Sequence, residues 1–188
     1  LGHLSHERVG SEILRMLDLP QVALSLLMMG EIGLLRFDDS VARALVAYEA
    51  LGGHSVAARL CLLAGDGLDE LQRAWRLSNA AVSSVERAAR LLAEDKVAEA
   101  AYRQGEAAVE GLAVVAAREG WGQARLAETA RALAALAVPD FPISGRDLTD
   151  LGMAPGPAMG RELARLERAW IESGFALGKR DLLLLARR

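Results

Sequence analysis

Alanine and leucine together occupy 68 of the 188 positions, and this abundance restricts the fold more than any other feature of the sequence. Both residues are strong helix formers, whereas aromatic residues make up only 4% of the chain. The sequence also lacks the runs of β-branched and aromatic residues that build strands. The composition therefore argues against a β-sandwich, a β-barrel or an ordinary α/β sheet, and it predicts an all-α protein.

Glycines divide the helical pattern into short pieces. Breaks fall at Gly52-Gly53, at 65–67 and at 120–122, and one of the intervening helices is predicted over Asp95–Arg103. The pieces show no fixed repeat period, which argues against a solenoid. We expect a multi-helix array of short helices that ends in a C-terminal helical hairpin.

A cluster of prolines marks a boundary near residue 138. Four of the five prolines fall between Pro139 and Pro157. Beyond the boundary, Ser144 followed three residues later by Asp147 predicts a capped helix start. Pro157 suits the first turn of a second, longer helix.

The helix predicted from Pro157 has two distinct faces. Its apolar residues fall within about 60° of arc at 100° per residue, and three arginines fall on the opposite side. The apolar set is Met159, Leu163, Leu166 and Trp170, and the basic set is Arg161, Arg165 and Arg168. Gly156 and Gly160 leave the backbone N–H groups of the helix start open, as in oxyanion sites. Two interpretations remain: a phosphate-binding hairpin, or a plain hairpin whose arginines are solvated.

Charge, cysteine and motif content exclude several classes of function. The net charge of −3 argues against a general coat for nucleic acid or membrane, and the longest apolar stretches are about half of a bilayer span. Cys61 is expected to be an inert core residue, which fits a cytoplasmic protein. His3, His6 and His54 lack metal-ligand spacing, and no nucleophile elbow or phosphate-binding loop is present. We expect no catalytic residue and no metal ligand in this chain.

Several segments of the sequence resemble motifs of the class II tRNA nucleotidyltransferases, which are the bacterial CCA-adding enzymes and their poly(A) polymerase relatives. Residues 141–148 (Phe-Pro-Ile-Ser-Gly-Arg-Asp-Leu) and 151–160 (Leu-Gly-Met-Ala-Pro-Gly-Pro-Ala-Met-Gly) resemble the tail signature of that family. Residues 4–9 with Glu12 resemble its last neck motif, and residues 76–79 (Arg-Leu-Ser-Asn) resemble an element of its body domain.

The resemblance implies a division into neck helices at 1–53, a helical body at 54–138 and a helical tail at 139–188. It also implies that the catalytic head, with its magnesium ions, is not part of this sequence. The template residues that select CTP or ATP would also lie outside it. The intact enzyme would add CCA to tRNA 3′ ends, and this piece is expected to be inactive alone and to hold no cofactor.

The resemblance assigns supporting roles to matching residues. Gly145, Arg146, Gly156 and Gly160 match the tail signature, which lies near the tRNA elbow in the family; with Arg161 and Arg165 they form the predicted RNA-binding set. This set would recognise the backbone shape and the 2′-hydroxyls of tRNA rather than its base order, and DNA is not an expected partner. Glu7, Arg8 and Glu12 match the neck motif that braces the template helix, or they are exposed charges on a capped helix.

Two alternatives to CCA addition stay open at this stage. An enzyme restricted to A addition or to poly(A) tailing would share this tail, because the residues that make that choice are expected upstream of it in the protein. A helical interaction module with no enzyme attached would also fit the pattern of short helices.

Overall fold

The computed structural model describes residues 6–33, 39–75 and 80–186. Every regular element within these ranges is a helix, so the prediction of an all-α array of short helices is confirmed. The predicted body element at 76–79 lies outside the described residues. In chain order the α-helices are α1 (His6–Leu17), α2 (Val22–Glu31), α3 (Asp39–Ala50), α4 (Val56–Ala64), α5 (Leu68–Trp75), α6 (Ala80–Ala93), α7 (Val97–Gln104), α8 (Ala107–Glu119), α9 (Gln123–Ala135), α10 (Gly145–Asp150), α11 (Pro157–Glu172) and α12 (Lys179–Ala186).

The predicted glycine breaks separate successive α-helices in the structure, but one predicted helix start is corrected. Gly120 has a φ of 64° and closes α8, since the N–H of Trp121 donates back to the carbonyl of Ala116. The helix predicted from Asp95 begins instead at Val97. Asp95 adopts a φ of 57°, and this left-handed residue turns the chain between α6 and α7.

The first hydrophobic cluster extends from α1 to α8, and the α6–α8 pair packs most closely within it. Gly111 of α8 is buried against α6, where a Cβ atom would lie 2.5 Å from Cβ of Ala88. Cys61 is buried here as predicted, and burial raises the pKa of its thiol to about 12. The cluster combines residues from both the predicted neck and the predicted body, and the division at 53/54 stays a prediction.

Two buried charged groups connect helices within this first part. Arg59 is 2% exposed, and its Nη1 donates to the carbonyls of Leu17 (2.7 Å) and Leu19 (2.8 Å). Its Nη2 donates to Glu49 Oε1 at 2.9 Å, so the guanidinium from α4 holds the C-terminal end of α1 to α3. Burial of Glu86 raises its pKa, but its bonds to Arg118 and Arg90 outweigh burial and hold the pKa below its usual value.

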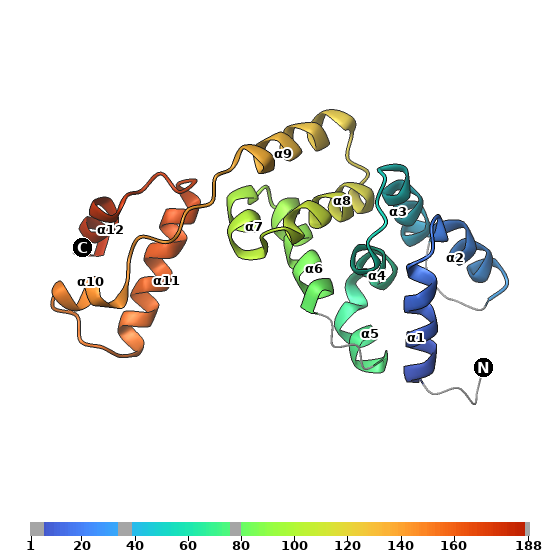
Figure 1. Ribbon diagram of the computed structural model, residues 1–188, viewed down its shortest axis with the longest axis horizontal. Coiled ribbons are helices and arrows are strands. Elements are labelled where there is room, and N and C mark those ends of the chain that lie inside the picture. The colour runs from blue at the N-terminus through green and yellow to red at the C-terminus, as the bar shows by residue number, and fades with distance from the viewer. Residues whose placement is uncertain (1–5, 34–38, 76–79, 187–188) are drawn as a thin grey trace.

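A second hydrophobic cluster forms the C-terminal part, hereafter the tail unit (α10–α12). Its buried residues are Ile143, Leu148, Met159, Leu166, Trp170, Ile171 and Leu182. Residues 136–144 contain no helix and lead from α9 to this unit. Figure 1 shows the result as an arch, with the tail unit at one end, α1 and α2 at the other, and α9 along the top. None of the described helices is long and apolar enough to cross a membrane.

Candidate nucleic-acid interface

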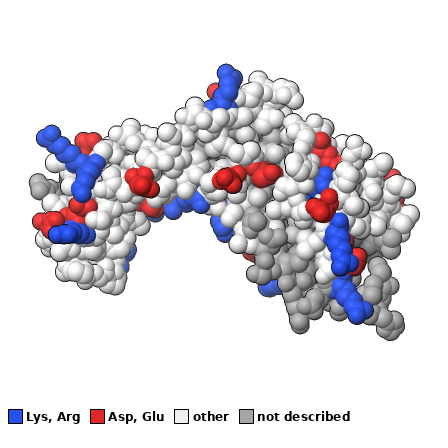
Figure 2. All heavy atoms as spheres, in the orientation of Figure 1, with Lys and Arg blue, Asp and Glu red and all other residues white. Residues whose placement is uncertain are grey.

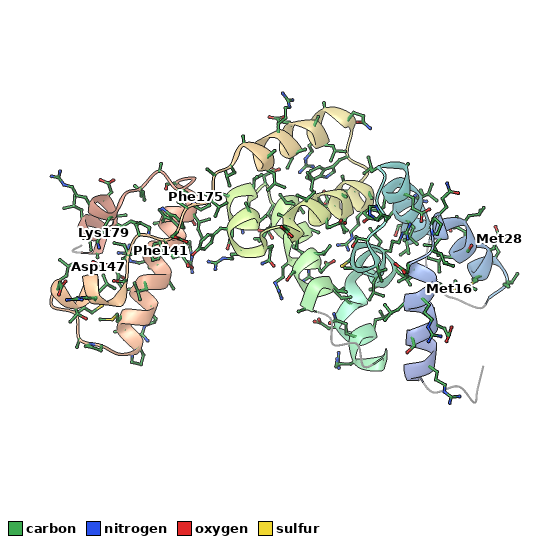
Figure 3. All side chains as sticks on the ribbon, in the orientation of Figure 1. Met16, Met28, Phe141, Asp147, Phe175 and Lys179 are labelled. Atoms are coloured by element: carbon green, nitrogen blue, oxygen red, sulfur yellow. The ribbon has the colours of Figure 1, made fainter. Side chains whose placement is uncertain are left out.

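A capping box sets the start of α10 and ties it to α12. The backbone N–H and the hydroxyl of Ser144 donate to Asp147 Oδ2 at 2.8 and 2.7 Å, as the sequence predicts. Lys179 Nζ lies 2.5 Å from Asp147 Oδ1, and Figure 3 shows this pair bridging α10 and α12. Lys179, followed by the Ser144 bonds, lowers the pKa of Asp147 to about 2. The start of α10 is therefore held from two sides.

Gly145 and Arg146, two of the predicted RNA-binding residues, lie in the first turn of α10. A Cβ atom on Gly145 would lie 3.3 Å from Sδ of Met159, so the missing side chain lets α10 approach α11 closely. Arg146 is exposed, and within the described part of the chain it forms no hydrogen bond or ion pair. Its guanidinium is available to a ligand.

The start of α11 opens to solvent. Gly156, the N-cap residue, has a φ of 154°, which side-chain-bearing residues rarely adopt, and no side chain caps the helix. Pro157 follows at the first helical position as predicted. Gly160 is exposed one turn later, and a Cβ atom there would meet nothing within 4 Å. The N–H groups of Ala158 and Met159 therefore have no side-chain partner at a partially positive helix end.

The three arginines of α11 are all exposed, but they are not equivalent. Arg165 donates to both carboxylate oxygens of Glu162 (2.9 and 2.6 Å) and to the carbonyl of Leu185 in α12 (3.0 Å). These bonds lower the pKa of Glu162. Arg161 and Arg168 form no hydrogen bond or ion pair with any described residue. Arg165 therefore holds α11 to α12, whereas Arg161 next to the open helix start remains free.

The predicted neck residues lie at the opposite end of the arch from the tail unit (Figure 1). Glu12 pairs with Arg15 on α1 at 2.7 Å, and both side chains are largely exposed. Arg8 is exposed, while the side chain of Glu7 lies outside the described part of the structure. The structure thus brings the tail residues together on α10 and α11 and leaves the neck residues on α1. Figure 2 shows basic side chains at both ends of the arch, interspersed with acidic ones.

Sequence reasoning missed two pairings that position this surface. Lys179 stands out as one of only two lysines, but nothing in the linear pattern links it to Asp147. Nor does the linear pattern show that Glu167 of α11 contacts Tyr102 and Arg103 of α7. In the described ranges, no group of His, Cys, Asp or Glu side chains is arranged to hold a metal ion.

The fold and these residues define an all-α chain whose separate C-terminal unit presents an open, basic helix start. The model of the tRNA nucleotidyltransferase domain 2 family matches residues 55–183. The chain belongs to this family.

One curated relative is the CCA-adding enzyme of Limosilactobacillus fermentum (strain NBRC 3956 / LMG 18251). It is 33% identical over an alignment of 142 positions, which covers 69% of this chain and 34% of that protein. The chain therefore spans about a third of the length of the curated relative it matches. No solved structure matches the chain.

Proposed function

We propose that this chain is the tRNA-binding and scaffolding portion of a CCA-adding nucleotidyltransferase. The observation that carries the proposal is the open start of α11, which is followed one turn later by Arg161, exposed and without a partner among the described residues. Arg146, equally exposed, follows Gly145 on α10, where a Cβ atom would lie 3.3 Å from Met159 of α11. Free N–H groups at a helix start, together with arginine, suit the phosphates of an RNA backbone. Membership of the tRNA nucleotidyltransferase domain 2 family supports tRNA as the RNA.

In this proposal the chemistry takes place outside the chain. The longer protein would bind CTP, ATP and magnesium in another segment, and the tail unit would hold the tRNA at a distance from its 3′ end. An A-adding or poly(A)-tailing member of the family remains an alternative. Nucleotide incorporation by the longer protein, measured with CTP and ATP separately, distinguishes these activities.

The binding test uses the difference between two neighbouring arginines. Arg161→Gln removes a free guanidinium, whereas Arg165→Gln removes one that is bound to Glu162 and Leu185. We expect Arg161→Gln to weaken tRNA binding at moderate salt and to lower the slope of log affinity against log salt by about 0.7–0.9, the range for one lost phosphate contact with single-stranded or duplex nucleic acid.

Arg165→Gln serves as the matched control, because it removes the same charge from the same helix. We expect it to change affinity less than Arg161→Gln does. Hydrogen exchange of α11 and α12 shows whether either variant has loosened the fold. Equal affinity and equal salt slope for the Arg161 variant and the parent would remove the start of α11 from the interface.

A further inference from the structure

The tail unit packs against the remainder of the described protein mainly at α7. Two partly buried residues of α7, Ala98 and Tyr102, pack against the second hydrophobic cluster of the tail unit. Among the described residues, α7 is the helix of the first part that packs substantially against α11. Residues 136–144 provide the covalent connection but form no helix. The angle of the tail unit therefore depends on the contact between α7 and α11.

Aromatic packing gives this contact a defined geometry. The ring of Tyr102 meets Trp170 edge-to-face, with centroids 5.3 Å apart and planes at 85°, and Trp170 is only 1% exposed. Phe175 and Phe141 flank Trp170 with centroids at 4.6 and 5.4 Å, and Figure 3 shows both near the junction. Edge-to-face pairs favour particular ring orientations, so this packing restrains rotation as well as distance.

A carboxylate on α11 adds two polar contacts to the same place. Tyr102 Oη donates to Glu167 Oε1 at 3.0 Å, and Arg103 Nη2 donates to Glu167 Oε2 at 3.0 Å. Burial and then the Glu167 bond raise the pKa of Tyr102, so its hydroxyl stays a donor at neutral pH. Consecutive residues of α7 thus bind both oxygens of the Glu167 carboxylate, and this two-point contact fixes the orientation of α11 relative to α7.

Beside this contact, the two helices are separated by an open cleft. The cleft has a volume of about 590 Å³, and its lining includes Lys96, Glu99, Arg168 and Glu172. The charges are mixed, so the cleft does not resemble an anion site. It leaves room for α11 to tilt once the Glu167 contacts are removed.

We propose that Tyr102, Arg103 and Glu167 form a fixed joint that sets the angle of the tail unit and so determines which RNA shapes the protein accepts. The three are positioning residues, because they act through Arg146 and Arg161. The selection of RNA rests on the proposed function, whereas the fixed angle does not. If the angle is fixed, an RNA held by the tail unit can take only one direction relative to the rest of the protein.

The angle can be measured without RNA by electron spin resonance on the full chain. Spin labels at Val109→Cys in α8 and Ala164→Cys in α11 report on the two sides of the joint, and both positions are exposed. The native Cys61 is buried and its thiol pKa is raised, so it escapes labelling. Tyr102→Phe combined with Arg103→Ala removes both polar contacts to Glu167 and retains an aromatic ring.

We expect one narrow distance distribution for the parent and about a fivefold larger population of other distances for the double variant, as for a loss of roughly 1 kcal/mol. Glu99→Gln is the matched control. It removes the negative charge that pairs with Arg103 within α7 but leaves Glu167 paired, and it should keep the narrow distribution of distances. The proposed joint would be overturned if the distance distribution of the parent were broad, or if that of the double variant were as narrow as that of the parent.

A second measurement, of RNA binding, distinguishes a failure of the proposed joint from a failure of the proposed function. We expect the parent to prefer a whole tRNA to a hairpin that carries only its acceptor stem, and the double variant to lose about fivefold of that preference. Arg146 and Arg161 remain intact in that variant. A parent that binds neither RNA refutes the proposed function, and the distance measurement then decides the joint alone. Retained preference in a double variant with a broadened distribution refutes the link to RNA shape.

Discussion

Replacing Gly111 with alanine tests the close packing at the centre of the first cluster. The new Cβ would lie 2.5 Å from Cβ of Ala88 and 2.8 Å from the backbone nitrogen of Ala89. Carbon atoms pack at about 3.5–4.0 Å, so α6 and α8 must separate by roughly 1 Å. The atoms that clash belong to the α6 backbone and to a methyl carbon without rotamers, and neither can turn aside.

The expected magnitude combines two opposing effects. Overpacking a core costs about 1–3 kcal/mol, and the rigid neighbours of Gly111 place this site near the upper end. Alanine is more favourable than glycine in a helix by about 1 kcal/mol. We therefore expect Gly111→Ala to lower the free energy of unfolding by about 2 kcal/mol.

The assay is urea unfolding followed by far-ultraviolet circular dichroism, with Gly160→Ala as the control. A Cβ atom on Gly160 meets nothing within 4 Å, so the same substitution should raise the stability of α11 by about 0.5–1 kcal/mol. Hydrogen exchange assigns each change to its own cluster. A Gly111 variant that is as stable as the parent would refute the inference that α6 and α8 pack too closely to admit a side chain at Gly111.

Two further predictions concern the tail unit. Trp170→Ala should lower the free energy of unfolding of the tail unit by about 3–5 kcal/mol, because the residue is buried in the second cluster. Helices α10–α12 should then lose hydrogen-exchange protection while α6 and α8 keep theirs. Equal loss of protection in both regions would contradict two separate clusters. The pKa of Asp147 is depressed to about 2, so its contribution to stability is present above the unfolded value near 4 and is lost as the pH falls through about 2. Carboxyl NMR titration should show this low midpoint and its rise in Lys179→Met, and a midpoint near 4 in the parent would contradict the bridge.

The helices could be predicted from the sequence because their signals are local. Ser144 and Asp147 are three residues apart, and the apolar face that carries Trp170 repeats at helical spacing. The left-handed Asp95 was missed, because aspartate also fits a helix start and the local pattern does not decide between the two.

The joint and the unequal roles of the arginines could not be predicted, because they depend on contacts between distant segments. Arg103 and Glu167 are 64 residues apart, and Arg165 reaches a carbonyl 20 residues away. Periodicity shows which face of a helix is polar, but it does not show which neighbouring helix that face meets. The sequence therefore predicted the candidate surface, and the structure distinguished Arg146 and Arg161, without partners among the described residues, from the bound Arg165.

The buried guanidinium of Arg59 has a consequence for comparisons among relatives. Arg59 lies inside the segment matched by the family, whereas its partners Leu17, Leu19 and Glu49 precede that segment. A buried positive charge that loses its partners destabilises a protein by several kcal/mol, about 3–5 in measured cases. Homologues in which different helices precede this domain should therefore carry an uncharged residue at this position, and arginine there should co-vary with the glutamate of α3.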